Sequence, residues 1–266
     1  MIERGFLIGA LATSVAIPAA AQDTSDDLAK KLVNPVADLV SVPLQGNYDH
    51  NIGPAKKGDR WTLNIQPVIP IGLNADWNLI SRTILPVTSQ NEIFPGAGSQ
   101  DGIGDVLQSL FFSPKKPTAG GWIWGAGPAF LLPTGSDELL TADKWGVGPT
   151  GVALKQTGPW TYGMLANHIW SVAGKKDRAD ISSTFVQPFV SYITATKTTF
   201  TVNSESTYDW KNRQWSVPIN LVVSQLLVVG HQPISIFAGA RYWAETPQSG
   251  PHNWGLRVGI TFLFPK

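Results

Sequence analysis

Six charged residues that fall at or within predicted strands are the chain's first candidates for chemistry: Asp76, Arg82, Asp105, Glu205, Arg241 and Arg257. The strand pattern described below predicts a barrel that crosses a membrane. In such a barrel an arginine that faces lipid near mid-membrane would cost about 2–4 kcal/mol, so these side chains are expected to point into the lumen. Two roles remain open for them. They could form a charged constriction that filters a solute, or ion pairs that stabilise the inside of a narrow barrel. The presence of both signs favours ion pairs slightly.

The histidines show no arrangement for nucleophilic catalysis. His168 and Ser171 lie three residues apart in one predicted strand, which places them on opposite faces. His50, His231 and His252 fall in predicted loops or turns, with no neighbouring serine and acid that resemble a triad. We therefore expect that the protein is not an enzyme.

Metal, cofactor and nucleic-acid sites are not indicated either. The chain has no cysteine and no His-Glu-x-x-His motif. Residues 146–151 match the Gly-x-Gly-x-x-Gly pattern in sequence. They lie inside a predicted strand, however, and not at the strand-to-helix turn that such a binding loop requires. The formal charge of +1 gives no electrostatic reason to expect nucleic acid. We expect no cofactor and no nucleic-acid partner.

The N-terminus reads as a cleavable secretion signal. Arg4 precedes an apolar run from Gly5 to Ile17, and Ala19–Ala21 supplies the small residues that signal peptidase reads. Residues 1–21 are the predicted signal peptide. Residues 22–37 form either a periplasmic segment or a plug in the lumen, and residues 38–266 form the barrel.

The rest of the chain predicts an all-β protein. Charged residues make up 15% of it, against about 25% in typical globular proteins. Segments of 10 to 13 residues, separated by turn-forming clusters, predict about twelve antiparallel strands. These are 38–48, 61–70, 75–86, 103–113, 121–132, 144–156, 159–171, 182–193, 197–208, 214–226, 232–243 and 253–264. That length and an even count fit a transmembrane, up-and-down β-barrel.

The connections alternate in length. Those at 71–74, 114–120, 157–158, 194–196 and 227–231 are mostly compact. Those at 49–60, 87–102, 133–143, 172–181, 209–213 and 244–252 are mostly longer and more polar. Outer-membrane barrels have short periplasmic turns and longer external loops, so both termini are expected in the periplasm.

The eleven tryptophans lie near the ends of predicted strands, as indole at a membrane interface does. Seven are expected at the external interface: Trp61, Trp145, Trp170, Trp210, Trp215, Trp243 and Trp254. Four are expected at the periplasmic interface: Trp77, Trp122, Trp124 and Trp160. Together they predict two aromatic girdles in contact with lipid.

Several motifs resemble a known bacterial family. They are Lys144–Thr150, Gly158–Gly163, Ala166–Ser171, Gln214–Asn220 and Gly239–Trp243, with the end Thr261–Lys266. This pattern is similar to the outer-membrane family labelled for the meta-pathway of phenol degradation, some members of which are misnamed neuromedin U. The resemblance covers roughly residues 33 to 266. It implies an outer-membrane barrel that passes small molecules, with aromatic or other hydrophobic compounds as one suggested class.

The function expected from the sequence is therefore passive passage of small solutes across the bacterial outer membrane. Its partners would be outer-membrane lipid, the solute and, during biogenesis, the barrel-assembly machinery. The alternative is a closed barrel with a structural or surface-interaction role, whose lumen is filled by side chains. An intermediate strand number does not separate the two, because smaller barrels are filled and larger ones are open.

Overall fold

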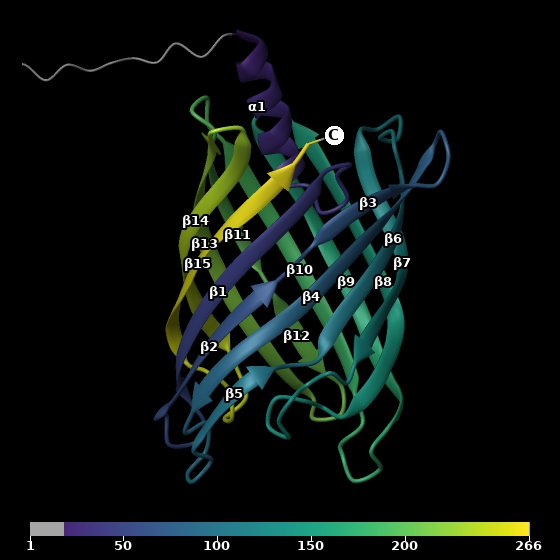
Figure 1. The fold of residues 1–266 in the computed structure, drawn as a ribbon. Helices are drawn as coiled ribbons and strands as arrows, with labels where there is room; N and C mark the ends of the chain where they lie inside the picture. The colour runs from purple at the N-terminus through teal and green to yellow at the C-terminus, as the bar shows by residue number, and fades with distance from the viewer. Residues whose placement is uncertain (1–18, 266) are drawn as a thin grey trace, which may run out of the picture.

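The computed structural model describes the backbone of residues 19–265 and the side chains of residues 25–265. Most of the predicted signal peptide, residues 1–21, lies outside the described residues. The described chain is one helix followed by a single antiparallel sheet that closes on itself (Figure 1). No described helix is both long enough and apolar enough to cross a membrane.

The elements follow the chain in order. They are α1 (Ala19–Leu32), β1 (Val40–Ile52), β2 (Gly58–Ile65), β3 (Val68–Gly72), β4 (Trp77–Asn91), β5 (Ser99–Ile103), β6 (Val106–Pro114), β7 (Trp122–Leu132), β8 (Lys144–Thr157), β9 (Trp160–Gly174), β10 (Ser182–Ile193), β11 (Thr198–Ser204), β12 (Ser206–Asp209), β13 (Gln214–Val229), β14 (Gln232–Glu245) and β15 (Asn253–Phe264).

Three wall strands are each split into two segments. β3 continues β2 beyond Gln66–Pro67, β6 continues β5 beyond Gly104–Asp105, and β12 continues β11 beyond Glu205. Fifteen segments less three continuations give twelve strands, the number predicted. The barrel closes where β15 pairs antiparallel with β1, from Val40 opposite Phe264 to Tyr48 opposite Leu256.

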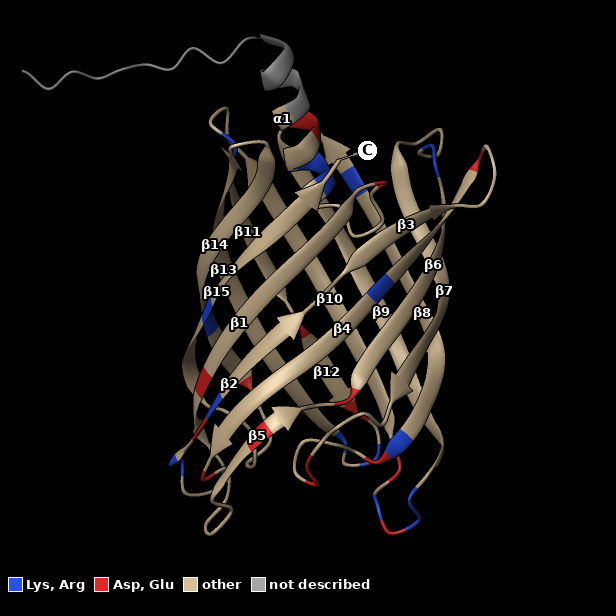
Figure 2. Ribbon diagram, viewed as in Figure 1, with Lys and Arg blue, Asp and Glu red and all other residues tan. Residues whose placement is uncertain are grey.

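Side chains alternate across the wall because successive residues of a strand point to opposite faces. In β9, Trp160, Tyr162 and Met164 are exposed on the outside, whereas Thr161 and Leu165 are buried on the inside. The outer surface is thus apolar over the middle of the wall. Figure 2 shows few charged residues on the wall and many in the loops at the end away from α1. A closed sheet with such an exterior is the form in which strands span a bilayer.

The two hairpins β1–β2 and β4–β5 are longer than predicted. The predicted loops 49–60 and 87–102 are mostly strand, since β1 reaches Ile52 and β4 pairs with β5 as far as Asn91 opposite Ser99. Both extensions carry polar residues on both faces, such as Thr88 and Ser89. The apolar alternation that marks a membrane strand is therefore missing there, although the backbone pairing continues.

Helix α1 and the last residues of β15 lie at one end of the barrel, which we call the terminal end (Figure 1). Short turns at 73–76, 158–159, 194–197 and 230–231 connect strands there, together with the turn at 115–121. The opposite end, the loop end, carries the connections at 53–57, 92–98, 133–143, 175–181, 210–213 and 246–252. The predicted alternation of short turns and longer loops is present.

Ten of the eleven tryptophans lie near one end of the wall or the other, with their rings on the outer surface. Trp77 meets Trp124 with ring centroids 5.8 Å apart, and Trp160 meets Tyr192 at 4.8 Å, near the terminal end. Near the loop end, Trp61 meets Tyr48 and Trp254 meets Tyr242, each at 4.9 Å. Trp122, Trp145, Trp170, Trp210 and Trp215 are also exposed on the outer surface. Trp243 is the exception, because its indole lies inside the lumen.

Candidate functional site in the lumen

A charged cluster occupies the middle of the lumen. Arg257 of β15 is 3% exposed and forms a two-point ion pair with Glu205, with N–O distances of 2.8 and 2.6 Å. Its Nε–H also donates to Asn47 Oδ1 of β1 at 2.8 Å. A guanidinium held at three nitrogens by a carboxylate and an amide has a fixed position, which suits a role in defining the width of the lumen.

Arg241 of β14 is held more loosely. Its Nη1 lies 3.6 Å from Asp49 Oδ2, and its guanidinium carbon lies 4.5 Å from the centre of the Trp243 ring. The Trp243 indole N–H donates to Asp49 Oδ1 at 2.7 Å. Arg241 Nε is buried with no hydrogen-bond partner among the described residues. Trp243 therefore supports an inner arginine and is not part of the lipid-facing girdle in which it was predicted.

A glycine stands opposite each of these arginines in the neighbouring strand. Gly239 stands opposite Arg257 in the β14–β15 pair, and Gly255 stands opposite Arg241. A Cβ at Gly255 would lie 2.9 Å from Asp49 Oδ1 and 2.6 Å from the Tyr48 carbonyl oxygen. A Cβ at Gly239 would lie 2.3 Å from the Leu221 carbonyl oxygen, so larger residues at these two positions would collide with the neighbouring strands.

Two further arginines face the same region. Arg82 of β4 donates to Gln66 Oε1 at 3.0 Å, and Arg60 of β2 donates to Gln90 Oε1 at 2.8 Å. β4 lies six positions from the β11–β12 strand in the ring of twelve, so Arg82 faces Glu205 from the opposite wall. Four arginines thus share the mid-lumen with two carboxylates, Asp49 and Glu205.

The cluster contains Arg82, Glu205, Arg241 and Arg257, which were predicted from the sequence, and adds Asp49 and Arg60, which were not. Both missed residues fall within the predicted loop 49–60. The alternation of β1 could have identified Asp49, because Asp49 lies two residues from the buried Asn47 and so points to the same inner face.

Asp76 and Asp105 do not join the cluster. Asp76 lies in the exposed turn 73–76, where its amide donates to Asn74 Oδ1 at 2.8 Å. Asp105 lies at the β5–β6 break and accepts hydrogen bonds from Gly135 N, Thr141 Oγ1 and Ala142 N at 2.6 to 3.1 Å. Asp105 therefore fixes the loop 133–143 against the start of β6.

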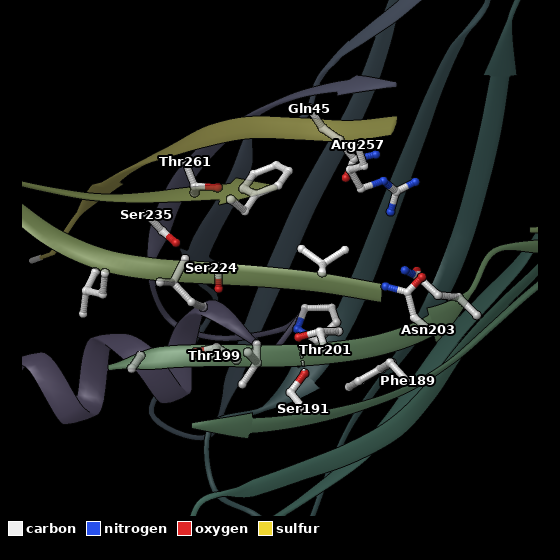
Figure 3. Close-up of a pocket in the computed structure, with 18 residues that line it drawn as sticks. Gln45, Phe189, Ser191, Thr199, Thr201, Asn203, Ser224, Ser235, Arg257 and Thr261 are labelled. Carbon is white, nitrogen blue, oxygen red and sulfur yellow. Dashed lines mark hydrogen bonds between the residues drawn. The ribbon is translucent and has the colours of Figure 1, made fainter. Parts of the chain in front are cut away.

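A polar chamber of about 230 Å³ lies between the charged cluster and the N-terminal segment. Hydroxyl and amide side chains from β1, β10, β11, β13, β14 and β15 point into it, with Arg257 toward the end away from the helix (Figure 3). The labelled ones are Gln45, Ser191, Thr199, Thr201, Asn203, Ser224, Ser235 and Thr261. Phe189 and Phe237 add two aromatic rings. The chamber therefore combines hydrogen-bonding groups with apolar surface.

The N-terminal segment lines the chamber on the side toward the terminal end. Leu28 and Ala29 of α1 are buried, with Ala37 and Leu39, against inward-facing Ile193, Leu226 and Leu263. Asp26 forms an ion pair with Lys197, and the Lys30 carbonyl accepts a hydrogen bond from Gln156 Nε2 at 2.9 Å. A second cavity, of about 190 Å³, lies on the other side of the segment and reaches Arg82.

The opposite part of the inner wall is apolar and filled. Ile80, Phe111 and Leu154 have no exposed surface, and they pack with Val36 and Leu165 into one cluster. The open space of the lumen is therefore concentrated on the β10–β15 side. No group of three or more His, Cys, Asp or Glu in the described part of the chain has the arrangement of a metal site.

Comparison with known proteins shows similarity in structure only. No family model matches the chain, and no curated protein does. The COG4313 outer membrane channel from Pseudomonas putida F1 has a TM-score of 0.67 at 14% identity, over 85% of this chain and 96% of that one. The NanC porin has a TM-score of 0.52 at 12% identity, over 84% and 98%.

An enzyme shares the same architecture. Outer membrane phospholipase A from Escherichia coli has a TM-score of 0.50 at 10% identity, over 85% of this chain and 96% of that one. The expectation that this protein is not an enzyme is corrected by this finding, because a barrel of the same kind carries out catalysis. The distant similarity assigns no activity to this chain. Together, the closed wall of twelve strands, its apolar exterior and these neighbours show a bacterial outer-membrane β-barrel.

Proposed function

We propose that the protein is a passive outer-membrane channel for small solutes. The polar chamber is the observation that carries the proposal, because a barrel filled by side chains would leave no such space beside the charged cluster. The fold shared with a channel and a porin supports it. The motifs noted in the sequence further support membership of the phenol meta-pathway family.

The chamber also supports a solute class. An engineered apolar cavity of about 150 Å³ holds benzene. A space of about 230 Å³ has room for a single ring with substituents. Phe189 and Phe237 provide apolar contact for the ring, and the hydroxyl-rich wall provides partners for a polar substituent. We propose small hydrophobic or aromatic compounds that carry a polar group.

We further propose that residues 22–37 act as a plug at the periplasmic side. The burial of Leu28 and Ala29 between inward-facing wall residues supports this role. The alternative of a closed barrel is favoured by a different observation, the apolar cluster around Phe111 that fills the opposite half of the lumen. Conductance separates the two proposals.

The test compares the conductance of three forms in planar bilayers. We expect a small conductance from the wild type and a larger one from Leu28→Asp/Ala29→Asp, because buried carboxylates disrupt plug packing. Lys30→Ala, at the exposed neighbouring position, is the matched control and should behave as wild type. If neither the wild type nor the double variant conducts ions or admits aromatic solutes into proteoliposomes, the closed barrel is correct.

A further inference from the structure

An unusual chain of polar groups lies on the outer surface near the loop end. His168 of β9 shares its outward face with Trp170, and their ring centroids are 4.1 Å apart. His168 Nδ1 lies 2.7 Å from Thr184 Oγ1 of β10, which accepts a hydrogen bond from Trp210 Nε1 at 2.8 Å. Ser182 Oγ lies 3.4 Å from His168 Nε2. Polar groups on a lipid-facing wall are stable only at headgroup level, where they find partners.

Aromatic rings continue this surface across the neighbouring strands. Tyr208 lies 4.8 Å from Trp210 and 4.9 Å from Trp215, measured between ring centroids. We call the six residues His168, Trp170, Thr184, Tyr208, Trp210 and Trp215 the β9–β13 patch. Amphipathic rings of this kind lie at the boundary between acyl chains and headgroups.

Three cations border the patch in the adjoining loops. Lys176 lies in the loop 175–181, and Lys211 and Arg213 lie in the turn 210–213. All three are exposed, and none forms an ion pair with another residue that the structure describes. Positive charge therefore remains available just beyond the aromatic level.

Most acids of the same region are already engaged. Asp180 pairs with Lys144 at 3.1 Å, and Asp143 pairs with Lys175 at 3.0 Å. Asp209 accepts hydrogen bonds from Lys211 N and Asn212 N within its own turn. Asp177 is the one acid of these two loops outside such contacts. No ion pair of the described residues therefore neutralises Lys176, Lys211 or Arg213, which suits an anionic group at this border.

We propose that the β9–β13 patch and its three cations bind a membrane lipid with a phosphorylated headgroup. The cations hold the phosphate, with the Arg213 guanidinium suited to two-point contact. Below the phosphate, the His168 imidazole and the Ser182 and Thr184 hydroxyls contact the ester and hydroxyl oxygens of the lipid. The acyl chains then lie along exposed apolar side chains further down the wall, such as Met164 and Val190. The order of these groups matches the order within such a lipid.

The experiment measures lipid binding to the full-length folded protein in detergent micelles by native mass spectrometry. Dioleoyl phosphatidic acid and dioleoylglycerol are the probes, because they differ only in the phosphate. We expect phosphatidic acid to bind at least tenfold more tightly. Lys176→Gln/Lys211→Gln/Arg213→Gln should remove most of this preference, since one cation near an anionic lipid contributes about fivefold.

The matched control is Lys56→Gln/Lys57→Gln in the loop 53–57, which removes similar exposed charge from another hairpin at the same end. It should change binding less than twofold. His168→Phe/Thr184→Val replaces polar groups of the patch with apolar side chains of similar size and should weaken phosphatidic acid binding several-fold. Heat-modified gel migration checks that this variant is folded. Equal binding by the triple variant and the wild type would overturn the proposal. So would an equal loss in the control, or full competition by millimolar inorganic phosphate.

Discussion

Glu205 interrupts a strand and neutralises a buried cation. It lies between β11 and β12, and its carboxylate takes both terminal nitrogens of Arg257. A buried charge left without its partner destabilises a protein far more than removal of both partners does. The ion pair thus serves the stability of the wall, whatever effect it has on a solute.

Glu205→Ala should lower the free energy of unfolding by about 3–5 kcal/mol, because Arg257 would stay buried without a counter-charge. Glu205→Ala/Arg257→Met should cost clearly less, since methionine fills similar space without a charge. Urea unfolding of the protein in lipid vesicles, followed by tryptophan fluorescence, measures both. Identical midpoints for the single and double variants would contradict this account.

The face of the wall to which a side chain points could be predicted wherever inward and outward residues alternate clearly along a strand. The alternation in β14 and β15 places Arg241 and Arg257 on the inner face. The same parity places Trp243 inside with Arg241, although an interface role was predicted from its strand-end position. The partner of Arg257 was not predictable, because Glu205 is 52 residues away and no local pattern joins them.

Among the elements, the membrane-embedded parts of the strands were predicted well. The predicted segments 182–193 and 253–264 coincide with β10 and β15. Apolar alternation marks those strands because one face meets lipid. The far ends of β4 and β5 carry polar residues on both faces, with Gln90 and Gln100 buried and Ser89 exposed, so they lack this signal and were predicted as loop. Hydrogen bonding between backbones holds them together.

The loop 175–181 is held to the barrel rim by the ion pair between Asp180 and Lys144. The hydrogen bond from Lys144 holds the pKa of the Asp180 carboxyl below its ordinary value of 3.8. Because the folded pKa is lowered, the pair stabilises the loop above the unfolded pKa, and the contribution is lost as pH falls through the folded pKa. We expect amide protection factors in this loop to be constant from pH 5 to 8 and to fall below pH 4.

In Asp180→Asn, amide protection in this loop at pH 7 should be as low as it is in the wild type below pH 4. The variant removes the carboxylate charge and keeps a side chain of similar size. Asp177→Asn, in the same loop but outside any ion pair of the described residues, is the control and should keep wild-type protection. Hydrogen exchange followed by mass spectrometry measures both variants. A pH profile in Asp180→Asn that still fell below pH 4 would assign the transition to another group.

At the scale of the whole molecule, strand number and the alternation of turn length were predictable from the sequence. Both follow from local signals, namely period-two alternation and turn residues. The contents of the lumen were not predictable. The chamber depends on which side chains of six strands meet after closure, and such contacts leave no pattern along the chain.

The orientation of the barrel in the membrane is open to a direct measurement. We expect trypsin added to intact cells to cut first in the segment 172–181, after Lys175, Lys176 or Arg178, because we propose that the loop end faces outward. Lys115 and Lys116 lie in a turn at the terminal end and should be protected until the membrane is opened. Early cleavage at that turn on intact cells would reverse the proposed orientation.

The pairing of β1 with β15 also determines how the protein can be assembled. Val40 and Phe264 are 224 positions apart, and neither strand has its second neighbour until the whole chain is present. Until then both edges expose unpaired backbone groups that can join other chains. Such distant contacts also make folding slow. An incomplete chain that lacks Asn253–Phe264 would thus aggregate, and the nascent protein requires protection until its last strand is delivered.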